Sequence, residues 1–356
     1  MYKLVLKNCF VIRKIACYVI IEGVMNPLFH CKLLNAPFGD PVLFIEILHE
    51  RQALLFDLGD ISSLGEAKIL KLSHVFISHA HMDHFYGFDH LLRIVLGRDK
   101  NITLYGPPGI ISNVAGKLSG YTWNLVKDYP LRLKVCEVNQ QSVRSACFIC
   151  SEQFQCGEGE EIPFKCVLEE NPHFKIESVH LDHRIPCLAF SLAERFHINI
   201  NKGNLAKLGF SVGPWLRELK QHIWEDKPED TMMEIPVEGG ERGEVQEVKL
   251  GDLKREIARI TPGQRIAYVT DCCYTQENVD KIVTLAKGAD LFFCEAAFLE
   301  KDRDKARAKD HLTARQAGII ARKAGVKTLS VFHFSPRYED CPESLEQEAQ
   351  LAFKGE

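Results

Sequence analysis

A short segment rich in histidine and aspartate is the strongest chemical signal in this sequence. Residues 78–84 read Ser-His-Ala-His-Met-Asp-His. Imidazole and carboxylate groups are the usual protein ligands of zinc and similar ions. In an extended chain His79 and His81 point to the same side, whereas Asp83 and His84 follow at a turn and can face a second ion. The segment therefore predicts a centre for two neighbouring metal ions; the alternative is a surface loop that happens to be rich in histidine.

The elements that position this segment can be read from short apolar runs that stop abruptly at polar residues. Runs of this length, rich in branched and aromatic side chains, are typical of strands buried on both faces. Helical patterns alternate with them, one from Thr275 to Gly288 and another from Thr313 to Gly325. This alternation predicts a layered α/β fold, in which ligands bind beyond the strand ends. The polar residues at those ends are Asp57, His79, Asp271, Glu295 and His333.

Composition limits the class of protein. The chain has 356 residues, of which 46% are hydrophobic and 26% charged, as in ordinary globular proteins. Its net charge of −4 does not predict a general nucleic-acid binder, so a phosphate must be attracted by a local patch or by bound metal.

The 13 cysteines and the lack of a secretory signal favour a reduced, cytoplasmic protein. Apolar residues 15–21 are too few for a membrane helix, and we interpret them as a buried strand, with no membrane partner.

Residues 195–262 interrupt the alternation, and we interpret them as an insertion that protrudes from the core. They include Gly213-Pro214 and a polar stretch at 238–243. Basic residues, with Trp215 and Trp224 between them, suit the recognition of an RNA backbone by shape. The alternative is an amphipathic hairpin that packs on the core or on a partner subunit. The basic residues are Lys202, Lys207, Arg217, Lys220 and Lys227.

A second irregular stretch, residues 136–165, is predicted to form a hairpin. Its Cys147 and Cys150, with Cys156 and Cys166 downstream, could suggest a structural zinc site. However, residues 147 and 150 fall on opposite faces of a strand, and no second cysteine pair has the spacing of metal ligands. Packed thiols are therefore the favoured interpretation.

Four segments together resemble the ribonuclease Z branch of the metallo-β-lactamase superfamily, which removes 3′ trailers from precursor tRNA. Residues 78–84 match the HxHxDH motif, and His183-Arg-Ile-Pro, Val269-Thr-Asp271 and residues 332–338 resemble three later motifs. The resemblance covers most of the chain. It implies one domain over residues 1–356, folded as a four-layer αβ/βα sandwich with a metal site at one edge of its two sheets. Residues 205–220, best matched at Gly213-Pro214, resemble the arm with which this family grips tRNA.

The resemblance also implies which residues bind metal. His180 is the alternative if the third histidine is assigned wrongly, and Asp57 would orient a ligand from behind. Two divalent ions are implied; the many histidines favour zinc, and manganese or iron remain alternatives. The implied ligands are His79, His81 and His183 for one ion, Asp83, His84 and His333 for the other, and Asp271 as the bridge between them.

The resemblance extends to the reaction, in which a metal-bridging hydroxide attacks phosphorus. The leaving alkoxide then needs a proton, and the motif positions of Glu295 and His311 make these two residues the candidates. Arg337 would contact the phosphate, and Asp83 completes the catalytic set. The structural alternatives are a strand-end ion pair for Glu295, an exposed helix-start histidine for His311 and a structural ion pair for Arg337.

These expectations leave three functions open. The first is a homodimeric, metal-dependent endoribonuclease that processes precursor tRNA. The second is a phosphodiesterase of the same fold acting on another or a small phosphoester, because residues 35–41, Thr270 and Cys272 depart from the family's motifs. The third is a non-catalytic RNA-binding or scaffold protein.

Overall fold

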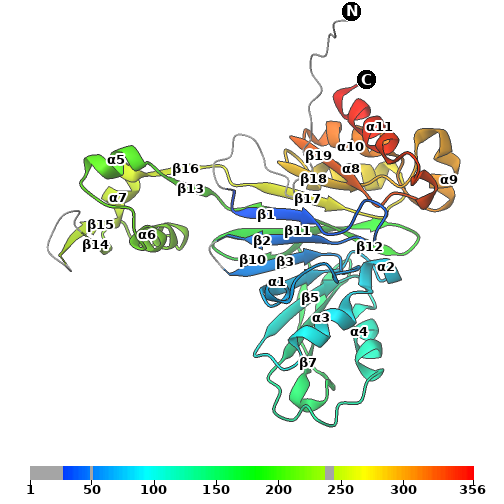
Figure 1. The fold of residues 1–356 in the computed structure, drawn as a ribbon, viewed down its shortest axis with the longest axis horizontal. Coiled ribbons are helices and arrows are strands. Elements are labelled where there is room, and N and C mark those ends of the chain that lie inside the picture. Colours follow the sequence, from blue (N-terminus) through cyan, green and yellow to red (C-terminus); the bar gives the residue numbers. More distant parts are fainter. Residues whose placement is uncertain (1–26, 49–50, 237–243) are drawn as a thin grey trace, which may run out of the picture.

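In the computed structural model of this chain, which describes residues 27–48, 51–236 and 244–356, two β-sheets face each other between outer layers of helices (Figure 1). The strand expected at 15–21 and the polar stretch at 238–243 lie outside the described residues. The first sheet runs in the order β1 to β8, with β9 paired to β7. Its strands are β1 (Phe29–Leu33), β2 (Leu43–Ile47), β3 (Gln52–Phe56), β4 (Leu72–Phe76), β5 (Asn101–Gly106), β6 (Arg132–Val138), β7 (Ser142–Ile149), β8 (Cys156–Gly157) and β9 (Glu161–Pro163).

The second sheet has the order β10-β11-β12-β17-β18-β19. Its last three strands are parallel to one another, so their carboxyl ends meet at one edge. The apolar runs predicted as strands form β3, β4, β17, β18 and β19, which confirms that prediction. The strands of this sheet are β10 (Val167–Glu170), β11 (Phe174–Asp182), β12 (Pro186–Glu194), β17 (Arg265–Val269), β18 (Leu291–Glu295) and β19 (Thr328–Phe332).

Aromatic side chains fill the space between the two sheets. The rings of Phe56 and Phe190 stack at 5.2 Å across the interface, and Tyr268 stacks on Phe332 at 5.3 Å. All four are buried. Because each sheet also buries its other face, strands of both sheets carry the nearly continuous apolar runs that the sequence shows.

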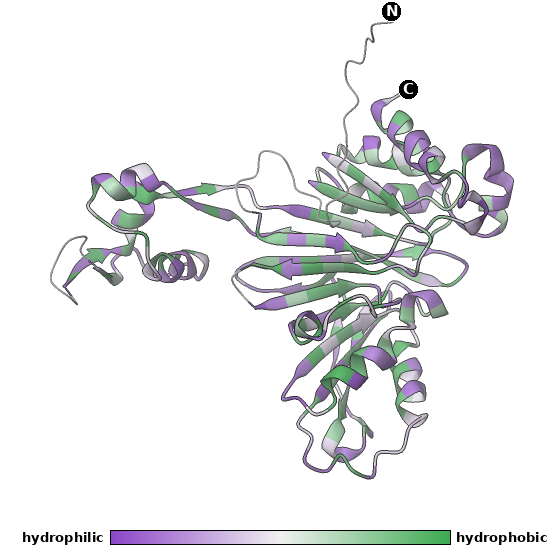
Figure 2. Ribbon diagram, viewed as in Figure 1, coloured by the Kyte–Doolittle hydropathy of each residue, from purple (hydrophilic) through white to green (hydrophobic). Residues whose placement is uncertain are grey.

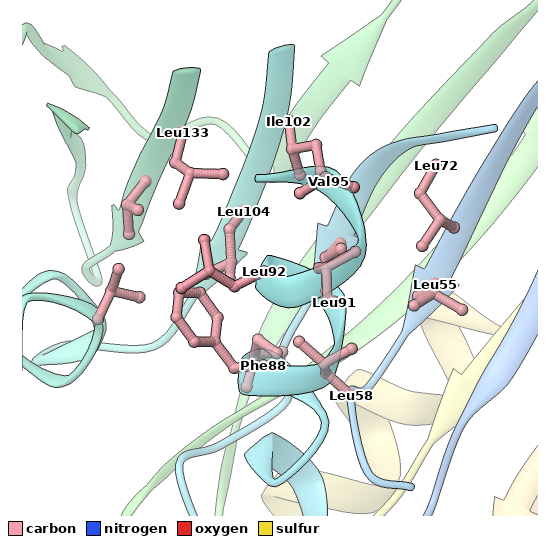
Figure 3. Close-up of a cluster of buried hydrophobic side chains, with 14 of the residues drawn as sticks. Leu55, Leu58, Leu72, Phe88, Leu91, Leu92, Val95, Ile102, Leu104 and Leu133 are labelled. Carbon is pink, nitrogen blue, oxygen red and sulfur yellow. The ribbon is translucent and has the colours of Figure 1, made fainter. Parts of the chain in front are cut away.

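Helices cover the outer faces. On the first sheet, α3 (Phe88–Val95) places Phe88, Leu91 and Leu92 against Leu104 of β5 (Figure 3). The strands are mostly hydrophobic, whereas the helices carry both hydrophobic and hydrophilic residues (Figure 2), of which the hydrophobic ones make up most of the buried residues. These four layers agree with the predicted αβ/βα sandwich. The other helices over the first sheet are α1 (Glu66–Ile69), α2 (Met82–Phe85) and α4 (Ile110–Ser119), and those over the second are α8 (Gln276–Leu285), α10 (Ala314–Ala324) and α11 (Pro342–Lys354).

Both predicted helix starts are confirmed by their caps. The side chain of Thr275 accepts a hydrogen bond from the Asn278 N–H, and Thr313 forms a reciprocal capping box with Gln316. The second helix ends as predicted at Gly325, whose φ of 64° is left-handed. The first ends at Leu285 with Ala286 as its cap, earlier than the predicted Gly288.

An arm of residues 197–261 extends away from the sandwich (Figure 1). Its stalk is the antiparallel pair β13 (His197–Ile200) and β16 (Ala258–Thr261). Trp215 and Trp224, predicted to lie among basic residues for RNA binding, are only 5% and 9% exposed because they pack in the arm's own core. They are therefore unavailable for stacking on RNA. The remaining elements are α5 (Lys202–Lys207), α6 (Trp215–Trp224), β14 (Met232–Pro236), β15 (Val245–Lys249) and α7 (Leu250–Ile257).

Residues 136–165, predicted to form a hairpin, include the end of β6 and the whole of β7, which pair antiparallel, and also β8 and β9, which pair antiparallel with β7. Cys147 is exposed on β7, whereas Cys150 is buried in the short 3-10 helix η1 (Cys150–Glu152). Among the described residues, no group with the geometry of metal ligands contains a cysteine. In the same ranges, no helix is long and apolar enough to cross a membrane.

Candidate active site

The seven expected metal ligands come together at one edge of the sandwich. Their donor atoms fall into three groups, and within each group all atoms lie within 4.8 Å of one another. The group of Asp271 and His333 with Glu295 and His311 overlaps both of the others. The first sheet contributes residues of the β4–α2 loop and α2, and the second contributes the β11–β12 turn and the ends of β17 and β19. These residues are His79, His81, Asp83, His84, His183, Asp271 and His333.

The first group consists of His79, His81 and His183 with Asp271. Asp271 Oδ2 lies 3.7 Å from His79 Nε2 and 3.6 Å from His183 Nε2. His183 Nδ1 lies 2.9 Å from the carbonyl oxygen of Asp310. Since a carbonyl only accepts, Nδ1 carries the proton and Nε2 keeps its lone pair toward the group.

The second group consists of Asp83, His84 and His333. His333 Nε2 lies 3.2 Å from Asp83 Oδ2, and His333 Nδ1 lies 3.0 Å from Asp271 Oδ1. Asp271 therefore faces His333 with one oxygen and the first group with the other. This is the arrangement that a bridging carboxylate requires.

Asp57 lies behind the second group and is completely buried. It accepts hydrogen bonds from the Ser78 N–H at 2.7 Å, the Ser78 hydroxyl at 2.9 Å, and the Tyr268 hydroxyl at 2.9 Å. It also accepts from His84 Nδ1 at 2.9 Å, which leaves His84 Nε2 facing the group. Sequence reasoning expected Asp57 to orient a ligand but missed Ser78 and Tyr268, because nothing in their local pattern shows which carboxylate they meet.

The backbone around the centre is held in an uncommon conformation. Asp57, Arg184, Asp310 and His333 have φ values of 59°, 57°, 60° and 60°, in the left-handed region that residues other than glycine rarely adopt. Two of them directly follow strands and the other two lie beside His183. Such backbone strain clusters at functional sites, where it aims side chains that regular strands would direct elsewhere.

Burial and charge suit the centre to cations. Burial lowers the pKa of His79 to about 2 and also lowers the pKa of His81, so both are neutral, as ligation requires. Burial would raise the pKa of Asp271, but His333 and His84 hold it well below its usual value. Burial likewise opposes the charged form of His84, yet Asp57 and Asp271 raise its pKa. The carboxylates therefore supply negative charge that divalent ions would neutralise.

Two buried nitrogens show that the donor set fits metal ions. His84 Nε2 and His333 Nδ1 face the carboxylates of Asp83 and Asp271 at 3.4 and 3.0 Å, but neither makes a well-aligned hydrogen bond within the described parts of the chain, and leaving such atoms unsatisfied is costly. Coordination to a metal would satisfy both. Two adjacent groups, each made of imidazoles and a carboxylate, fit a pair of divalent ions such as zinc.

Glu295 and His311 form a hydrogen-bonded pair beside the two groups. Glu295 is fully buried; its Oε1 accepts from the Cys272 N–H and its Oε2 lies 2.9 Å from His311 Nδ1. Burial lowers the pKa of His311, but the Glu295 carboxylate outweighs this and raises it above the usual value. A pocket of about 290 Å³ is lined by His311, with Asp83 and His333, but not by Glu295. His311 is thus the one of the two candidates that can reach a substrate.

Two residues that the sequence suggested for the site, Arg337 and His180, do not line this pocket. Arg337, in the 3-10 helix η3 (Pro336–Tyr338), lies over the ring of Phe298 at 5.3 Å and 3.9 Å from Asp302, and it does not line the pocket. This arrangement matches its structural alternative better than a phosphate contact. His180 belongs to neither group of ligands and packs against Phe164, so the alternative third histidine is not needed.

Comparison with known proteins supports the same class. The metallo-beta-lactamase fold protein YhfI from Bacillus subtilis has a TM-score of 0.52 and 16% identity, over 90% of this chain and 92% of that one. No family model matches the chain. The Ribonuclease Z of Deinococcus radiodurans is 31% identical over 81% of this chain and 83% of its own length. That of Brevibacillus brevis is 30% identical over 84% and 82%.

Fold and site together define a protein of the metallo-β-lactamase fold with side chains that could hold divalent metal ions. The sequence relationship is more specific than the fold. Over four fifths of its length the chain matches curated relatives at up to 31% identity, and it belongs to the ribonuclease Z family.

Proposed function

We propose that this protein is a metal-dependent endoribonuclease that removes 3′ trailers from precursor tRNA. The observation that carries the proposal is that two donor groups lie on either side of Asp271, and that Asp83 and His333 of the second group line one pocket together with His311. His79, His81 and His183 would hold one ion, Asp83, His84 and His333 the other, and Asp271 would contact both. When bound, the ions would promote ionisation of water and offset charge on the phosphoryl oxygens.

The chain's own residues supply the proton for the leaving group. A ribose oxygen leaves as an alkoxide, so it needs a proton during the reaction. Glu295 accepts from His311 Nδ1, so His311 Nε2 is the atom that can give a proton. The raised pKa of His311 favours the protonated form that this role requires.

Four finer features belong to the proposal. Zinc is the proposed metal because imidazoles dominate the donor set, with manganese and iron as alternatives. The arm would contact RNA through positive charge, because Lys202 and Lys207 of α5 are exposed. The two tryptophans of the arm, both in α6, are buried. A homodimer and a cytoplasmic location remain predictions from the sequence.

The test is cleavage of a precursor tRNA with a 3′ trailer by the purified, zinc-loaded protein. The expected result is one cut that releases the trailer, lost on chelation and restored by zinc. A His81→Ala variant, which lacks one donor of the first group, is the control against a contaminating nuclease. Turnover of a chromogenic phosphodiester without any cut in the RNA would instead favour the small-ester alternative.

A further inference from the structure

The loop between β1 and β2 forms one wall of the active-site pocket. Phe38, Gly39 and Asp40 line that pocket together with His311 and His333. None of the three was a predicted site residue, because residues 35–41 stood out in the sequence only as a departure from the family's motifs. Their position raises the question of what an aromatic side chain does beside a phosphodiester site.

The loop is held rigidly against the centre. The Phe334 N–H, directly after the ligand candidate His333, donates to the Pro37 carbonyl at 2.7 Å. The Asn35 amide donates to the carbonyl oxygens of Asp40 at 2.7 Å and Asp60 at 2.9 Å. The loop is therefore preorganised with respect to the metal ligands, as a substrate-binding wall must be.

The Phe38 ring is fixed on one side and accessible on another. It packs edge-to-face on Phe334, with ring centroids 5.6 Å apart and an interplanar angle of 81°. Phe334 and Phe298, which also line the pocket, are 3% and 2% exposed, whereas Phe38 is only partly buried. Phe38 thus offers the pocket an apolar aromatic surface that neither metal binding nor proton transfer explains.

We propose that Phe38 is a specificity residue that stacks on the nucleobase next to the scissile phosphate. The inference rests on the proposed function and narrows its substrate to phosphodiesters that carry an unstacked nucleoside. Base stacking on an aromatic ring is favourable for every base, so this contact selects nucleotides without reading sequence. Flipped or single-stranded nucleotides can reach such a ring, whereas bases within a duplex cannot.

The other groups of the pocket suit the rest of a nucleotide. Lys309 is exposed at the pocket, and no acidic partner for its ammonium group is found in the described ranges, so it can pair with a neighbouring phosphate. Asp40 brings a carboxylate to the same loop, and this carboxylate can accept from ribose hydroxyls or base amino groups. It would also repel a further phosphate on that side.

The test compares two esters with the same leaving group in the zinc-loaded protein. Thymidine p-nitrophenyl phosphate, as its 5′ and its 3′ ester, carries a base; ethyl p-nitrophenyl phosphate does not. The variants are Phe38→Ala and the conservative Phe38→Tyr. Phe353→Ala is the matched control, because Phe353 is another partly buried phenylalanine on the same core but does not line the pocket. Metal content and melting temperature are measured for each.

Phe38→Ala is expected to lower kcat/KM for at least one thymidine ester about 5- to 100-fold. The ethyl ester should change less than about 2-fold, and Phe38→Tyr should retain the preference for the thymidine ester. Equal losses on all esters would show a structural role, and unchanged kinetics would show no contact with the base; either result overturns the proposal. If the wild-type protein hydrolyses none of the esters and does not cut RNA, the proposed function itself fails, a result distinct from both.

Discussion

At the scale of single residues, the centre depends on groups that never touch a substrate. Asp57 fixes His84 through one hydrogen bond and is itself fixed by Ser78 and Tyr268. Such partners set the tautomer and direction of a metal-binding histidine. Asp57 lies 27 residues before His84 in the sequence, but through this hydrogen bond it can control the affinity of the site for metal.

Replacing Asp57 by asparagine should weaken metal binding by about 10- to 100-fold. Asparagine keeps the shape and accepts a left-handed backbone, but it loses the charge and one acceptor oxygen. The measurement is zinc affinity by competition with a chelator. Asp60→Asn, at a partly exposed carboxylate that accepts a hydrogen bond from the Ser62 N–H, is the control. An unchanged affinity in Asp57→Asn would contradict the role given to this residue.

Replacing His311 by alanine should slow RNA cleavage by about 10²- to 10⁴-fold. Turnover of bis-p-nitrophenyl phosphate should fall much less, because nitrophenolate leaves without needing a proton. Glu295→Gln, which can still accept from the Cys272 N–H, should reproduce part of the RNA effect. Comparing kcat for the two substrates separates proton donation from general damage; equal losses on both would rule out a proton-donor role.

The metal-free protein should lose stability as pH rises. Burial lowers the pKa of His333, but Asp271 and Asp83 outweigh it and raise the value to about 10, above the unfolded-state value of about 6.5. Its stabilising contribution is fully present below the unfolded value and disappears as pH rises through the folded one. Melting temperatures of chelated protein should thus fall between about pH 7 and about pH 10. Metal-loaded protein, whose histidines would be neutral ligands, should show less change; a flat profile without metal would refute this account.

At the scale of elements, the arm is nearly independent of the sandwich. It has a core of its own, which includes Trp215, Leu219 and Leu253. It joins the second sheet through the β13–β16 stalk, and its Trp224 also packs edge-to-face on His173 of the body, with ring centroids 4.6 Å apart. Acidic and basic residues both occur on it, so RNA contact must come from a local patch such as that on α5.

Reversing two charges on α5, in the double variant Lys202→Glu and Lys207→Glu, should raise KM for precursor tRNA. The effect should be about tenfold or more and should shrink as salt increases. Turnover of a small diester should stay unchanged, because the arm lies away from the pocket. Lys287→Glu with Lys323→Glu, at exposed lysines on the body of the protein, is the matched control. An equal effect from both pairs would indicate that only net charge matters.

The elements also show how far sequence reasoning extends. Strands that stop at Asp271, Glu295 and His333 could be predicted because buried parallel strands are short apolar runs, and functional residues gather at their ends. The hydrogen bond from Tyr268 to Asp57 could not, since it joins strands of different sheets. The burial of Trp215 could not be predicted either, because a local sequence pattern does not show that the arm has a core of its own.

At the scale of the whole molecule, the site exists only when both sheets pack together. Asp83 and His84 come from the side of the first sheet, whereas His183, Asp271 and His333 come from the second. The aromatic layer that includes Phe56, Phe190 and Tyr268 sets the distance between them. The seven candidate ligands, which the structure brings close together, could be named from motifs, but the loop of Phe38 and the position of Arg337 depend on this packing and could not.

The most direct test of the central claim is a zinc titration of metal-free protein that follows bound metal and cleavage of precursor tRNA in the same sample. Since Asp271 belongs to one donor group and directly faces His84 and His333 of the other, the rate of trailer release should reach its full value only near about two equivalents of zinc per chain. His81→Ala should need more zinc and stay well below the wild-type rate. Full activity below one equivalent, or no cleavage at any metal content, would contradict a two-metal ribonuclease.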